Sequence, residues 1–171
     1  MSRTNSLAFL LAALTAASTT PAFAHVGLEP SQAVADTTIA LGFRIGHGCG
    51  TSPTTAVKVR IPAGVTAVRP QPKPGWTLSL VTAPGTVAPG AAADQAPAPV
   101  VTEVHWTGGK LANEFYDTFF LRMRVPNTPN ATVYFPVVQE CETGAHRWID
   151  VPQPGQPEPA EPTPGLRLTA P

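Results

Sequence analysis

One histidine, His25, lies where cleavage of the chain would change its chemistry. Ahead of it, Arg3 precedes a short apolar run over residues 7–17, and Ala22-Phe23-Ala24 supplies the small-x-small pattern that signal peptidase accepts. Cleavage after Ala24 would make His25 the first residue of the mature chain. Its α-amine and its ring Nδ1 could then close on one metal ion as a chelate, and such a pair of nitrogens suits Cu(II). Any residue can follow a cleavage site, so a metal site needs partners elsewhere in the sequence.

The same segment indicates where the protein acts. The apolar run is too short to cross a membrane, and no later segment approaches the roughly 20 consecutive apolar residues of a transmembrane helix. Residues 1–24 are therefore predicted to be a secretory signal peptide. The mature chain is expected to be a soluble periplasmic or secreted protein without a membrane span.

The two cysteines, Cys49 and Cys141, fit an exported protein. They lie far apart in the sequence and match no close-spaced zinc pattern, so a disulfide between distant strands is the favoured interpretation. A thiolate site for Cu(I) is the alternative, and titration of free thiols distinguishes the two. The chain has 2 methionines, and Met1 would leave with the signal peptide. This composition argues against a methionine-based Cu(I) site.

The elements that must position these residues are predicted to be strands. The 21 prolines and 14 glycines disfavour a helical bundle, because proline removes a backbone donor and glycine weakens helix interiors. Apolar residues instead alternate at period two, which is typical of half-buried strands. β-rich runs of this kind cover residues 39–45, 57–61, 77–81, 100–106, 119–125, 132–138 and 146–151. The sequence therefore predicts an all-β fold, a two-sheet β-sandwich of the immunoglobulin or cupredoxin-like kind.

The sandwich is expected to occupy residues 25–151 as one domain. Within it, the Pro- and Gly-rich stretch 83–99 is predicted to be a flexible loop insertion that joins two paired strands. Residues 152–171 are again rich in proline and include Glu158 and Glu161. They are predicted to form an extended tail outside the packed core.

Composition excludes several classes of function. The 11 basic and 11 acidic residues balance, so the chain lacks the positive charge typical of proteins that bind nucleic acid or anionic lipid. Hydrophobic residues make up 43% of the chain, which is enough for a core and argues against wholesale disorder. The sequence contains no nucleophile elbow, no Gly-rich phosphate loop, no CxxC and no HExxH.

A series of short segments follows in order along the chain: His25-Val-Gly-Leu-Glu-Pro30, His47-Gly-Cys49, Pro72-Lys-Pro-Gly-Trp76, Trp106-Thr-Gly-Gly109, Glu114-Phe-Tyr-Asp117, Tyr134-Phe-Pro-Val-Val-Gln-Glu-Cys141 and His146-Arg-Trp-Ile149. Together they resemble the YcnI-like copper-binding domain, from His25 to about Val151. Several motifs in the expected order are more specific than any one of them.

This resemblance implies a β-sandwich that holds one Cu(II) per chain by a monohistidine brace. Matched position by position, His25 would give amine and imidazole nitrogens, Glu114 would give a carboxylate oxygen, and Trp148 would pack beside the metal. The implied function is that of a periplasmic copper carrier, buffer or metallochaperone, with other periplasmic or membrane copper-handling proteins as partners. The insertion at 83–99 departs from the compact pattern of the family.

Each of these residues also has a plain structural interpretation. Glu114 precedes a predicted strand as a solvated carboxylate would, and Trp148 alternates with apolar neighbours as a core residue would. The other two tryptophans are interpreted as core or loop-packing residues: Trp76 and Trp106. Three more residues are candidates for orienting the site, although the sequence does not rank them: Glu29, Tyr116 and Asp117.

Two rival functions remain open. A copper-dependent oxidative enzyme also begins with histidine, but it needs a second histidine in the equatorial plane of the metal. The candidates by residue type are His47, His105 and His146, of which His146 is nearest in sequence to Trp148. Histidines within strands or turns more often serve structural hydrogen bonds, and the chain lacks long aromatic-rich loops for a flat sugar surface. The other rival is a metal-independent interaction module, which calorimetry with Cu(II) distinguishes. The sequence predicts a carrier and not an enzyme.

Overall fold

The computed structural model describes residues 25–85 and 98–171. The predicted signal peptide, residues 1–24, and most of the predicted insertion at 83–99 lie outside the described residues. All the regular elements of the described part are β-strands, as predicted. No helix there has the length and apolar character needed to cross a bilayer.

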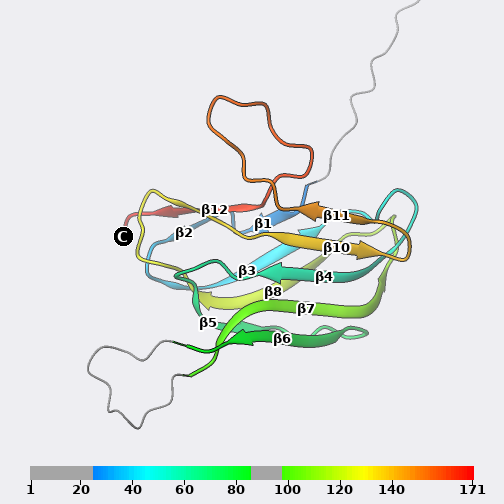
Figure 1. Ribbon diagram of the computed structural model, residues 1–171, viewed down its shortest axis with the longest axis horizontal. Coiled ribbons are helices and arrows are strands. Elements are labelled where there is room, and N and C mark those ends of the chain that lie inside the picture. The colour runs from blue at the N-terminus through cyan, green and yellow to red at the C-terminus, as the bar shows by residue number, and fades with distance from the viewer. Residues whose placement is uncertain (1–24, 86–97) are drawn as a thin grey trace, which may run out of the picture.

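The described strands form three sheets (Figure 1). The first has the order β1 (Gly27–Glu29), β3 (Thr38–Ile45), β8 (Asp117–Arg124), β5 (Thr66–Pro70). The second has the order β11 (Ala145–Trp148), β10 (Val137–Cys141), β4 (Thr54–Arg60), β7 (Val100–Leu111), β6 (Thr77–Ala83). The third has the order β2 (Gln32–Val34), β12 (Gly165–Thr169), β9 (Thr132–Tyr134). A β-sandwich is therefore confirmed, with a third small sheet that the sequence did not predict.

Register explains which residues form the core. β3 and β8 pair antiparallel with Leu41 opposite Leu121 and Phe43 opposite Phe119, and these four side chains are buried. Neighbouring residues of the two strands on the opposite face, such as Arg44, Phe120 and Arg122, are exposed. The second sheet contributes buried residues to the same hydrophobic cluster: Val57, Val59, Val104, Trp106 and Val137. Burial on one face and exposure on the other is what period-two alternation predicts.

Two tryptophans are packing residues, as their sequence context suggested. Trp106 is fully buried, and its indole ring lies 5.4 Å from the ring of Phe119. Trp76 contacts the same phenyl ring edge-on, with 4.9 Å between the centroids. Both therefore belong to the apolar core and its border.

The tail prediction is wrong. After β11 the chain leaves the sandwich as a loop and returns as β12, which pairs parallel with β2 and antiparallel with β9 (Figure 1). Leu166 and Leu168 are fully buried. The domain therefore extends past Val151 almost to the end of the chain. The short alternation Leu166-Arg167-Leu168 follows the prolines of residues 152–164. Residues 165–169 contain no proline, so they can pair as a strand.

Other differences concern short strands. The predicted strand 132–138 is two strands, β9 and β10, in different sheets, because the chain changes sheet at Phe135 and Pro136. The three-residue strands β1 and β2 are too short for a periodic signal. The pairing of residues 77–81 with 100–106 is confirmed by the antiparallel register of β6 and β7.

Candidate metal centre

Three histidines and one tryptophan gather in one region of the sandwich. His25, just before β1, has its ring 6.0 Å from the indole of Trp148 and nearly perpendicular to it. His146 and Trp148 are two residues apart on β11, so both side chains project from the same face, with 5.1 Å between their rings. His47, in the turn after β3, has its ring 5.7 Å from that of His146. These four residues are called the histidine cluster below.

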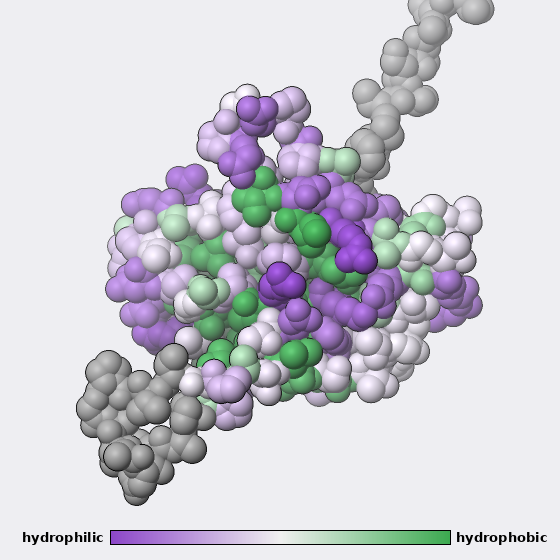
Figure 2. Space-filling model, in the orientation of Figure 1, coloured by the Kyte–Doolittle hydropathy of each residue, from purple (hydrophilic) through white to green (hydrophobic). Residues whose placement is uncertain are grey.

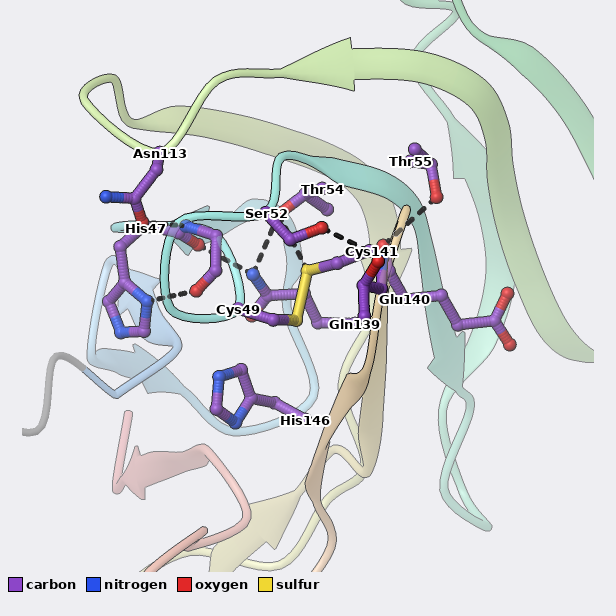
Figure 3. The surroundings of a disulfide bond; sticks show 12 residues. His47, Cys49, Ser52, Thr54, Thr55, Asn113, Gln139, Glu140, Cys141 and His146 are labelled. Carbon is purple, nitrogen blue, oxygen red and sulfur yellow. Dashed lines mark hydrogen bonds between the residues drawn. A yellow bond between two sulfur atoms is a disulfide. The ribbon is translucent and has the colours of Figure 1, made fainter.

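The turn that carries His47 is closed by its own backbone. The N–H of Cys49 donates to the carbonyl of Ser52 at 2.9 Å, and the N–H of Ser52 donates to the carbonyl of Cys49 at 3.0 Å. A Cβ atom at Gly48 would collide with the Ser52 carbonyl oxygen, so the turn requires glycine there. The Gly48 carbonyl in turn contacts the imidazole Nδ1 of His47 (Figure 3). The turn therefore fixes both the backbone and the ring of His47.

A disulfide ties this turn to β10. Cys49 and Cys141 are bonded, with 6.0 Å between their Cα atoms, and the described part of the chain contains no free cysteine. The predicted disulfide is confirmed, and the alternative of a thiolate metal site is excluded for the oxidised protein.

Gln139 on β10 connects three parts of the region. Its Nε2 donates to the carbonyl of His47 at 2.6 Å and to Oγ1 of Thr54 at 2.8 Å, while its Oε1 accepts from Nε1 of Trp148 at 3.2 Å. The side chain is only 1% exposed. Buried polar groups require partners of this kind, so the amide fixes the turn of His47 and the indole relative to each other.

Glu114 lies in the exposed loop between β7 and β8, in a turn where the N–H of Phe115 donates to the carbonyl of Ala112. Its neighbour Asn113 accepts, through Oδ1, the N–H of Gly48 at 3.1 Å, which anchors this loop to the turn of His47 (Figure 3). The Glu114 carboxylate has no hydrogen bond or ion pair within residues 25–85 and 98–171. Its oxygens are therefore not committed to protein donors.

The side chains alone do not make a multi-ligand centre. In the described part of the chain, no group of three or more His, Cys, Asp or Glu side chains is arranged to hold a metal ion. The structure brings the ring of His25 to Trp148. Glu114 lies on a separate loop, which is linked to the turn of His47 through Asn113.

Sequence reasoning missed the partner of His146. Nδ1 of His146 donates to Oε1 of Glu161 at 2.7 Å, and the N–H of Arg147 donates to Oε2 of the same carboxylate at 2.7 Å. Burial raises the pKa of Glu161, but hydrogen bonds from His146 and from the Arg147 N–H outweigh it, so the pKa lies below its usual 4.5. The sequence places Glu161 in the predicted tail, and only the return of the chain brings it to β11.

The remaining candidates have other partners. Glu29 pairs with Arg44 at 2.8 Å. Asp117 pairs with Lys73 at 2.6 Å. Tyr116 is 71% exposed in the loop beside Glu114. None of these contacts orients a member of the histidine cluster.

His105 on β7 bonds to Glu103 at 2.8 Å through Nε2. That hydrogen bond is the main cause of a pKa of Glu103 below the usual value, against the opposing effect of burial. His105 therefore has the structural role expected of a histidine within a strand.

These features define a class: a disulfide-linked β-sandwich in which two histidines from distant segments contact one buried tryptophan. The chain belongs to the family described as "Domain of unknown function (DUF1775)", whose pattern it matches over residues 25–168. The match extends past Val151 and ends at residue 168 within β12, in agreement with the place of the last strand in the domain.

A solved structure supports the fold. It is the crystal structure of an uncharacterized protein from Nocardia farcinica, reported to reveal an immunoglobulin-like fold. The two chains are 25% identical with a TM-score of 0.65, over 85% of this chain and 98% of the other. No curated protein matches the chain.

Proposed function

We propose that the mature chain, beginning at His25, binds one Cu(II) ion and serves as an exported copper carrier or buffer. The observation that carries the proposal is the contact between His25 and Trp148, with 6.0 Å between their rings. It occurs in a chain of the DUF1775 family whose segments from His25 to about Val151 resemble the YcnI-like copper-binding domain. Copper is the cargo of this function, and other exported or membrane copper-handling proteins are its partners.

The donor chemistry supports this function. An N-terminal amine and the imidazole of His25 give two nitrogens in a chelate, and the carboxylate of Glu114 adds an oxygen and lowers the net charge of the Cu(II) site. Trp148 is 2% exposed, and Gln139 holds its indole in place beside His25. The indole therefore shields one side of the imidazole from water.

The experiment is a calorimetric Cu(II) titration of protein whose intact mass shows that it begins at His25. Three changes test the brace: His25→Ala deletes the imidazole, Glu114→Gln removes the charge of the oxygen donor, and a Gly-Ser extension ahead of His25 converts the amine into an amide. We expect His25→Ala and the extension to abolish tight 1:1 binding and Glu114→Gln to weaken it. His105→Ala is the matched control, because that ring is bonded to Glu103 within β7, which carries no member of the histidine cluster.

Equal Cu(II) affinity with and without the extension would mean that the amine is not a ligand. Absence of tight binding by the correctly processed protein would instead favour the metal-independent interaction module. The proposal is of a carrier and not of a catalyst. Peroxide consumption with release of oxidised oligosaccharides by the copper-loaded protein would overturn that part of it.

A further inference from the structure

His146 is held in the way that proteins hold metal-binding imidazoles. Its Nδ1 faces the carboxylate of Glu161, and an ionised carboxylate can accept hydrogen bonds but cannot donate them. Nδ1 therefore carries the proton of this hydrogen bond, which leaves the lone pair of the imidazole on Nε2. Both oxygens of Glu161 are occupied, one by Nδ1 of His146 and one by the N–H of Arg147. A carboxylate behind an imidazole fixes the tautomer and raises the basicity of the opposite nitrogen.

The opposite nitrogen has no partner. Nε2 of His146 is buried and makes no hydrogen bond, one of two such side-chain atoms within the described residues. Buried polar atoms are nearly always paired, so an unpaired one needs a physical explanation. A ligand that accepts the lone pair is such an explanation.

His47 is the neighbouring imidazole. Its ring lies 5.7 Å from that of His146, and Figure 3 shows the two rings on the same side of the disulfide, reaching toward one region from the turn and from β11. The disulfide and the hydrogen bond from Gln139 fix the turn that carries His47. The two imidazoles therefore form a pre-arranged pair from segments that are about a hundred residues apart in the sequence.

We infer that His47 and His146 form a two-imidazole site for a monovalent copper ion, separate from the amine and ring of His25. Within the described chain no third His, Cys, Asp or Glu joins the pair, whereas Zn²⁺ in proteins takes four ligands. Cu(I) has a closed d shell and accepts two nitrogens. This inference goes beyond the proposed Cu(II) function and does not depend on the brace.

Charge favours the monovalent ion as well. An imidazole that binds a metal ion carries no charge of its own, and Glu161 is already satisfied by hydrogen bonds, so no anionic ligand compensates a second positive charge in a partly buried place. The indole of Trp148 lies 5.1 Å from the ring of His146 and adds an aromatic surface next to the site. The cluster would thus offer Cu(II) and Cu(I) different donors around one tryptophan.

The test is an anaerobic Cu(I) titration of the processed protein, with the ion supplied as its acetonitrile complex against a chromogenic Cu(I) chelator. We expect one Cu(I) per chain. Replacing His47 or His146 by Ala should weaken binding by more than the roughly 10- to 100-fold that loss of a ligand's outer partner costs. Glu161→Gln should weaken it about tenfold. His105→Ala, which removes another carboxylate-bonded histidine, should leave it unchanged.

Two further measurements keep the inference falsifiable. X-ray absorption of the Cu(I) protein should show the edge of a two-coordinate ion with nitrogen ligands, and circular dichroism should confirm that each variant is folded. The Gly-Ser extension ahead of His25 should leave Cu(I) affinity unchanged while it abolishes tight Cu(II) binding. The inference would be overturned if the extension abolished Cu(I) binding, or if folded His146→Ala protein kept the same Cu(I) affinity. Neither result would decide the Cu(II) proposal, which the Cu(II) titration tests separately.

Discussion

Replacing Gln139 by Met should destabilise the protein strongly although it conserves side-chain size. The substitution removes the donor to the His47 carbonyl at 2.6 Å and the acceptor for the indole N–H of Trp148 at 3.2 Å. Each buried group that loses its partner costs about 1–3 kcal/mol. The two together predict a loss of about 2–6 kcal/mol, a large part of the roughly 5–15 kcal/mol that stabilises a typical domain.

The measurement is urea denaturation of the oxidised protein, followed by tryptophan fluorescence. For a slope of about 1–3 kcal/mol per molar urea, the midpoint should fall by about 1 M or more, with the slope unchanged. Gln139→Glu should keep one of these two contacts, because its carboxylate still accepts from Trp148 but does not donate to the His47 carbonyl. Gln32→Met is the control, since Gln32 is exposed on β2 and should change stability by no more than about 0.5 kcal/mol.

If Gln139→Met unfolded at the same urea concentration as the control, the amide would not be what holds the turn and the indole together. The argument for a pre-arranged histidine cluster would then lose its main structural support. A double variant that adds Trp148→Phe sharpens the result. Removing the indole donor as well should restore part of the lost stability, because that donor is then no longer stranded.

The remaining predictions concern the disulfide, an ion pair and the last strand. Reducing the disulfide, which closes a separation of 92 residues, should lower the free energy of unfolding by about 4–5 kcal/mol, measured as a fall in Tm with and without reductant. Glu103→Gln should lower Tm at neutral pH. Because the pKa of Glu103 is lowered in the folded state by its bond to His105, that difference should be fully present above the usual 4.5 and vanish as the pH falls through the lowered value. Truncation before β12 should expose the surfaces that Leu166 and Leu168 cover, and each buried leucine contributes about 1.5–3 kcal/mol, so the shortened chain should unfold at much lower urea or remain insoluble.

The sequence predicted the strands that carry a long alternation. Residues 39–45 and 119–125 pair as β3 and β8, with their apolar side chains on one face. Alternation is sufficient there because each strand has a core face and a solvent face, and period two assigns residues to them. The disulfide was also predictable, since two distant cysteines in a chain with a predicted signal peptide have few other uses.

The candidate site was predictable only in part. Type and position singled out His25, whereas Glu114 and Trp148 were implied by the resemblance to the YcnI-like domain. The structure places His25 against Trp148. Glu114 as a copper ligand stays a prediction. The role of Glu161 could not be predicted, because it depends on the return of the chain after Val151, and the proline-rich sequence there gives no signal of that return.

What the sequence by itself determined is local: which segments are strands, which faces are apolar, and which residue types are able to bind copper. The tertiary structure alone decided that His47 and His146 face each other, that Glu161 holds the second of these rings, and that the last strand completes the domain. The physical reason is that periodicity encodes the environment of a single strand, whereas contacts between distant segments depend on register and on the path of the loops. Those are fixed only when all the apolar faces are buried together.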